Sequence, residues 1–83
     1  MPHDDLQKDA GRVLIDQHVA LYRDAEGALH AITSICPHMG CDVGWNDREK
    51  VWDCPCHGSR FRPTGEVIRG PAVKPLVVVA VPE

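Results

Sequence analysis

The fold of this chain is decided by two short stretches, CPHMGC at residues 36–41 and CPCHGS at residues 54–59. All four cysteines of the 83-residue chain lie in these stretches, together with two of its five histidines. Random placement rarely gathers thiols and imidazoles in this way. A metal centre or a disulfide is therefore expected where the two stretches meet.

Three kinds of site compete for these residues. A structural zinc site would use four of the six side chains, but the close pairs are not the usual C-x₂₋₄-C knuckles and two thiols would be left over. A bare disulfide or thiol-exchange site would leave both histidines idle, and no C-x-x-C is present. Cys36 and His38 from one loop, with Cys54 and His57 from the other, give C-x-H-x₁₅-C-x₂-H. That two-plus-two set suits a [2Fe-2S] cluster.

The rest of the composition predicts an all-β fold. Ten valines against five leucines, with seven glycines and seven prolines, favour short strands joined by turns. Trp45 and Trp52 should face one another across a hairpin. The final apolar run, LVVVAV, predicts a buried closing strand. The expected strands cover residues 12–15, 18–23, 28–33, 43–45, 51–53, 61–62, 66–68 and 76–81.

The length and charge of the chain limit the number of domains and the kinds of partner that it can have. The length leaves room for one domain, residues 1–83. Nine basic and twelve acidic residues are scattered along the chain, which argues against a nucleic-acid partner. Apolar runs are too short for a membrane span, and the polar, acidic N-terminal segment is unlike a signal peptide. We therefore expect a soluble, cytoplasmic protein. His3, His18 and His30 lack any partner spacing, so they receive no role.

Both cysteine-histidine stretches resemble the boxes of Rieske proteins nearly residue for residue, and the likeness runs from about residue 31 to residue 76. The resemblance implies a small fold of short antiparallel sheets with two cluster-binding loops at one tip. It also implies a [2Fe-2S] cluster in which two histidines replace two cysteines on one iron. By that implication Cys36 and Cys54 hold one iron, while His38 and His57 hold the other.

The resemblance also implies a disulfide between Cys41 and Cys56 that clamps the two loops together. Rieske proteins of the quinol-oxidising cytochrome complexes carry such a bridge, whereas Rieske ferredoxins and oxygenase domains lack both cysteines. The alternative is two separate thiols, because a reducing cytosol opposes disulfides.

Five further residues are expected near the cluster because they resemble family positions. Two glycines would let backbone N–H groups approach the sulfides, and a serine would donate a hydrogen bond to one of them. A phenylalanine stands where the highest-potential relatives have a tyrosine, which puts the top of the potential range in doubt. A proline belongs to the loop that covers the cluster. These residues are Gly40, Gly58, Ser59, Phe61 and Pro71.

The implied function is one-electron transfer, without a catalytic site in the chain itself. Residues 43–76 most closely resemble the C-terminal Rieske domain of bacterial FAD-dependent oxidoreductases of the amino-acid oxidase type. A flavin domain or another redox protein would then dock near His38 and His57. A membrane quinol oxidoreductase is disfavoured because no N-terminal anchor is seen and the boxes are close together. The alternatives are a standalone Rieske ferredoxin serving an oxygenase or another reductase, and a zinc-stapled interaction module.

Overall fold

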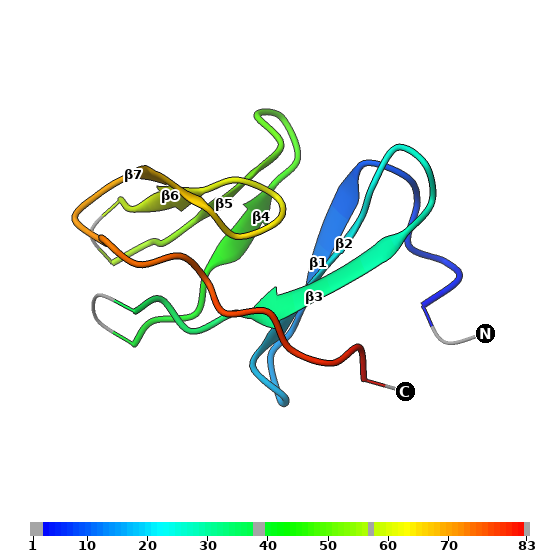
Figure 1. Cartoon of the computed structure of the whole chain (residues 1–83), viewed down its shortest axis with the longest axis horizontal. Coiled ribbons are helices and arrows are strands. Elements are labelled where there is room, and N and C mark those ends of the chain that lie inside the picture. The colour runs from blue at the N-terminus through cyan, green and yellow to red at the C-terminus, as the bar shows by residue number, and fades with distance from the viewer. Residues whose placement is uncertain (1–2, 38–39, 57, 83) are drawn as a thin grey trace.

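A computed structural model describes residues 3–37, 40–56 and 58–82 of the chain. These residues form seven β-strands in two antiparallel sheets and no helix (Figure 1). The predicted all-β class is confirmed. Because the described residues contain no helix, none of them belongs to a helix able to cross a bilayer.

The first sheet is a three-stranded meander made of β1 (Ala10–Leu14), β2 (Val19–Arg23) and β3 (Leu29–Thr33). Its β2–β3 turn follows from the side chain of Asp24, whose Oδ1 accepts the backbone N–H groups of Glu26 and Ala28. Such an Asx-type contact, followed by a glycine at positive φ, is a common way to reverse a chain.

The second sheet has the order β4 (Gly44–Asn46), β5 (Val51–Asp53), β6 (Arg60–Phe61) and β7 (Val67–Arg69). Trp45 and Trp52 are register partners, and their ring centroids lie 4.7 Å apart in an edge-on arrangement. The predicted tryptophan pair is therefore confirmed. Trp52 is fully buried, and its indole N–H donates to the carbonyl of Pro63, so the large ring carries no unmet polar group.

The two sheets are joined where β1 meets β4. Trp45 lies so close over Gly11 that any Cβ at this position would overlap the indole ring. The same ring contacts Tyr22 of β2 at a centroid distance of 5.5 Å. One core then runs through both sheets and into the loops that carry the cysteines. Its buried members are Ala20, Tyr22, Ile32, Cys36, Val43, Trp52, Cys54, Phe61, Ala72 and Leu76.

The predicted buried closing strand at residues 76–81 is wrong. The segment lies along the edge of β3, with one isolated bridge between Ile32 and Val78. Only Leu76 is buried, at 2% exposure, whereas Val77 and Val78 are 65% and 75% exposed. The described residues provide no second layer to cover these valines, so the apolar run is an extended tail along the sheet edge.

Tyr22 should titrate well above the range of an ordinary tyrosine. Burial, and then a 2.6 Å hydrogen bond donated to Asp9, raises its pKa to about 12. The neutral ring therefore stabilises the folded state below pH of about 10, and this contribution is lost as the pH rises through the folded pKa. Tyr22 is the sole tyrosine, so tyrosinate absorbance reports it alone. A midpoint near 10 in a chain still folded by circular dichroism would contradict the prediction.

Candidate metal centre

The first cysteine loop follows β3 and closes on itself through its backbone. The N–H of Cys36 donates to the carbonyl of Cys41 at 2.7 Å, and the N–H of Gly40 donates back to the carbonyl of Cys36 at 2.9 Å. Gly40 has φ of 75°, a conformation that side chains with a Cβ rarely adopt. The loop is thus a tight turn that begins at Cys36.

The second loop, between β5 and β6, is the same turn repeated. Cys54 donates to the carbonyl of Ser59 at 2.8 Å, and Gly58 donates to the carbonyl of Cys54 at 3.0 Å. Gly58 has φ of 81°. Each turn therefore begins with a cysteine and has a left-handed glycine four residues later. This geometry confirms the need for positive φ at both glycines, whereas their predicted approach to sulfides stays a prediction.

The leading cysteines of the two turns belong to the same buried core. Cys36 is 1% exposed and Cys54 is 2% exposed, and neither is in a disulfide. The structure therefore brings these two predicted thiol ligands into one interior region. The predicted imidazole ligands, His38 and His57, lie outside the described residues. No cluster of three or more metal-binding side chains is found among the residues that are described.

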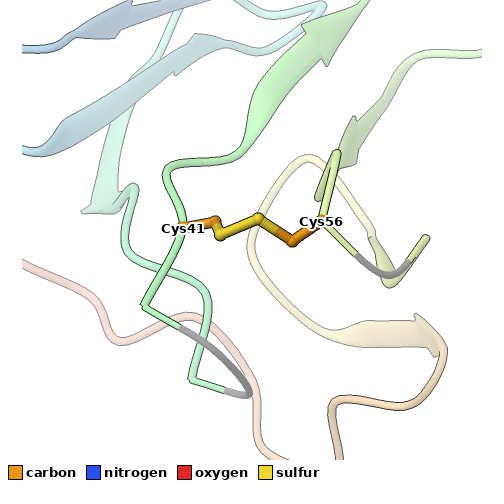
Figure 2. Close-up of a disulfide and its surroundings, with 2 residues drawn as sticks. All are labelled: Cys41 and Cys56. Carbon is orange, nitrogen blue, oxygen red and sulfur yellow. A yellow bond between two sulfur atoms is a disulfide. The ribbon is translucent and has the colours of Figure 1, made fainter.

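A disulfide links the two turns. Cys41, from the first turn, is bonded to Cys56, from the second, with their Cα atoms 6.5 Å apart (Figure 2). The predicted bridge is confirmed. It divides the four cysteines into two groups, because Cys41 and Cys56 form the clamp whereas the buried Cys36 and Cys54, the predicted thiol ligands, are not in a disulfide.

Ser59 shows that the donor groups fit a sulfide-containing cluster. Its side chain is fully buried, and its Oγ accepts the backbone N–H of Ala72 at 3.0 Å. A hydroxyl also has one hydrogen to donate, and no hydrogen bond donated by Ser59 Oγ is found among the described residues. A buried donor without an acceptor is costly unless a further group receives it. A bridging sulfide would be such a group, so the residues present fit a [2Fe-2S] cluster.

The other predicted neighbours lie close to the two loops. Phe61 is fully buried in the core that contains Cys36 and Cys54, and it pairs in register with Trp52. Pro71 is exposed and lines a cavity of about 180 Å³ with Pro37 of the first loop. The segment predicted to cover the cluster therefore lies against the first loop.

A polar network that was not predicted from the sequence braces the first loop. The Oδ1 atom of Asp42 accepts the hydroxyl of Ser34 at 2.5 Å and lies 3.0 Å from Nδ1 of His18. These two hydrogen bonds hold the pKa of Asp42 below its usual range. Ser34 and Asp42 bracket the first box, a position that hints at a supporting role. His18 is distant in sequence and could be found only from the fold.

Comparison with known proteins identifies the family. The sequence pattern of the Rieske [2Fe-2S] domain matches residues 1–82. The chain belongs to the Rieske [2Fe-2S] domain family. The predicted cofactor, a [2Fe-2S] cluster, and the Rieske fold are thereby confirmed.

Relatives of this Rieske chain include larger proteins. It is 62% identical over 55 residues to a putative Rieske 2Fe-2S iron-sulfur protein of Bacillus subtilis, a match that covers 66% of this chain and 11% of that protein. It is 47% identical over 58 residues to cytochrome b6-f complex iron-sulfur subunit 1 of Synechocystis, covering 68% of this chain and 33% of the subunit. The chain therefore spans a third or less of these two relatives.

Solved structures show the same architecture. The plasma membrane Rieske protein of Synechocystis superposes with a TM-score of 0.73 at 32% identity, covering 86% of this chain and 73% of that one. A chain from a hyperthermophilic respiratory Complex III gives 0.75 at 28% identity, covering 92% and 61%. The fold of this chain is thus shared with both solved structures.

Replacing both Cys41 and Cys56 by serine should leave a cluster that assembles but is less stable. The bridge closes a loop with a sequence separation of 15, for which the chain-entropy model gives about 3 kcal/mol. We expect unchanged iron per chain and faster loss of visible absorbance in guanidinium. Wild-type protein treated with a thiol reductant is the matched control and should behave like the variant. Loss of iron from the double variant would contradict a purely structural bridge.

Proposed function

We propose that the chain carries single electrons through a [2Fe-2S] cluster bound by Cys36, His38, Cys54 and His57. The observation that supports this is the repeated turn, which buries one cysteine thiol in each loop while the remaining two cysteines form the clamp. When bound, the cluster supplies reversible one-electron chemistry. The chain contributes the ligands, a buried environment and two loops held at a fixed separation.

The residues around the site favour an intermediate reduction potential. Rieske centres span about −150 to +300 mV, against about −400 mV for plant-type ferredoxins. The buried hydroxyl of Ser59 would stabilise the more negative, reduced centre by donating a hydrogen bond. Phe61 is buried in the same core as Cys36 and Cys54 but has no hydroxyl to donate. A potential below the top of the Rieske range follows from this pair of residues.

We further propose that the electrons are exchanged with an FAD-dependent oxidoreductase of the amino-acid oxidase type. The likeness of residues 43–76 to the Rieske domain appended to such enzymes supports this partner. The 62% identical stretch in the Bacillus relative forms only 11% of that protein, which agrees with a Rieske unit that works beside a larger polypeptide.

A quinol-oxidising complex is the second candidate partner. It is favoured by the disulfide and by the likeness to cytochrome b6-f iron-sulfur subunits. The absence of a hydroxyl at Phe61 argues for the flavoprotein, because a lower potential makes the cluster a weaker oxidant of quinol.

The ligand assignment predicts a sharp division among the Cys and His variants. Alanine at any of the four proposed ligands, Cys36, His38, Cys54 or His57, should abolish cluster assembly and impair folding, because a bound centre contributes directly to stability. Iron analysis and the visible spectrum report the outcome. His30→Ala is a matched histidine control outside the proposed ligand set, since His30 bonds Asp24 in the β2–β3 turn, and it should retain two irons per chain. Full iron content in His57→Ala would overturn the assignment.

The partner proposal predicts a preference between electron donors. Oxidised protein would be mixed anaerobically with a substrate-reduced FAD-dependent oxidoreductase from the same genome, and separately with decylplastoquinol. With the flavoprotein, we expect the cluster to be reduced at the same rate as the flavin is reoxidised, with one electron taken up per chain. With the quinol, we expect the rate of cluster reduction to be at least about tenfold lower. Faster reaction with the quinol would replace the flavoprotein by a quinol-oxidising setting without affecting the ligand assignment.

A further inference from the structure

We propose that an acidic redox protein docks on the surface made by Ile68, Arg69, Val73 and Lys74, called here the 68–74 surface. This inference rests on the proposed function, because it names the kind of partner with which the cluster exchanges electrons. A single electron crosses the interface, so that oxidation of one protein is matched by reduction of the other.

The 68–74 surface lies beside both cysteine turns. Val73 and Lys74 line the cavity of about 180 Å³ that also contains Pro37, the neighbour of Cys36. Ala72 donates its backbone N–H to Ser59 at the end of the second turn. Figure 1 shows this segment, in orange, at the end of the molecule away from the first sheet and both termini. A protein bound here is therefore close to the proposed centre.

The centre of this surface is apolar and unusually exposed. Val73 is 87% exposed, whereas its neighbour Ala72 is 3% exposed and anchors the segment in the core. Ile68 on β7 is 50% exposed. Exposed apolar side chains that occur singly are ordinary, but Val73 also lines the cavity beside Pro37 of the first cysteine loop. An apolar centre ringed by polar groups is the common anatomy of a protein interface.

The charges next to this apolar centre are positive and unopposed. Residues 54–75 contain four bases and one acid. Of the bases, Arg60 is paired with Glu49 at 2.7 Å and with Asp53 at 3.0 Å. Arg69 and Lys74 are exposed and form no hydrogen bond or ion pair with the described residues.

The acid of this segment lies elsewhere. Glu66 accepts a hydrogen bond from Thr64 and lines a different cavity, beside β3 and the C-terminal tail. It therefore does not neutralise the cations next to the first cysteine turn.

The opposite end of the molecule is acidic. Residues 1–34, which form the first sheet and its turns, contain six acids and three bases. An acidic partner is attracted to the 68–74 surface and repelled from the first sheet, so charge both speeds the encounter and orients it. A second copy of the chain is a poorer occupant. It would have to present its own acidic end, and a head-to-tail contact of that kind does not close into a dimer.

The test uses full-length protein with its cluster and a double charge reversal, Arg69→Glu with Lys74→Glu. The matched control is Lys8→Glu with Arg48→Glu, which makes the same charge change at two exposed residues outside the surface. Reduced protein is oxidised by anionic ferricyanide or by cationic tris(phenanthroline)cobalt(III), each taking one electron. Oxidised protein is reduced by an acidic plant-type ferredoxin, a downhill transfer from about −400 mV. Rates are measured at low and high salt.

For wild type and the control, reaction with ferricyanide and with the ferredoxin should be fast at low salt and slow down as salt is added. The double reversal should lower both rates by about tenfold at low salt and raise the rate with the cobalt complex. Equal effects of the two double variants would overturn the surface, since only net charge would matter. Salt-sensitive self-association of wild type in sedimentation would assign it to a second copy and also overturn the proposal.

Loss of the cluster from a variant and absence of the cluster from wild-type protein have a different meaning. If the double reversal lost its cluster, Arg69→Gln with Lys74→Gln removes the charges without adding acids and should still slow the ferredoxin reaction severalfold. If wild-type protein had no reducible visible spectrum, the proposed electron-transfer function itself would fail. With the cluster intact, salt-independent rates for all three reagents would overturn the docking surface alone.

Discussion

Two copies of one backbone turn are the constraint on which the rest of the structure depends. Each turn fixes its leading cysteine through an N–H bond to the residue five positions later, and each needs a glycine at positive φ to close. Each turn by itself positions only one thiol. A centre shared by two loops also requires tertiary contacts that hold the two turns at a fixed separation. The Cys41–Cys56 bridge and the pairing of β4 with β5 solve it together.

The first sheet serves this arrangement as a support. Trp45, just beyond the first turn, packs on Gly11 of β1 and against Tyr22 of β2, and its hairpin partner Trp52 leads into the second turn. The Nζ of Lys50 adds a hydrogen bond to the carbonyl of Asp9 at 2.9 Å. Because close-packed interiors transmit displacement, a change at the β1–β4 junction is felt at both turns. Three of the four Trp, Tyr and Phe residues of the chain meet at this junction, because both tryptophans and the single tyrosine are in contact through Trp45.

The sequence predicted features that depend on neighbouring residues and missed features that depend on long-range contacts. The hairpin with its tryptophan pair and the all-β class depend on residues close together in the chain, and the structure confirms them. The run LVVVAV predicted a buried strand because periodicity measures only the strand's own side chains, whereas burial needs a second layer. His18 and Asp42 stand far apart in sequence and meet only once the β1–β2 turn lies against the residues that flank the first box, so no spacing rule could pair them.

Charge is distributed differently over the first sheet, which supports the cysteine turns, and over the region of the turns themselves. Acids gather in the segment that forms the first sheet, whereas the segment around the second turn is rich in bases. The thiols are buried on the core side of the turns, where bulk water and reactive small molecules are excluded. The covering segment next to them is exposed at Val73 and anchored at Ala72. An electron carrier needs both properties, because a buried centre is protected but transfers electrons only where a partner can approach it closely. The 70–74 segment meets this need by keeping one residue in the core and its neighbour in solvent.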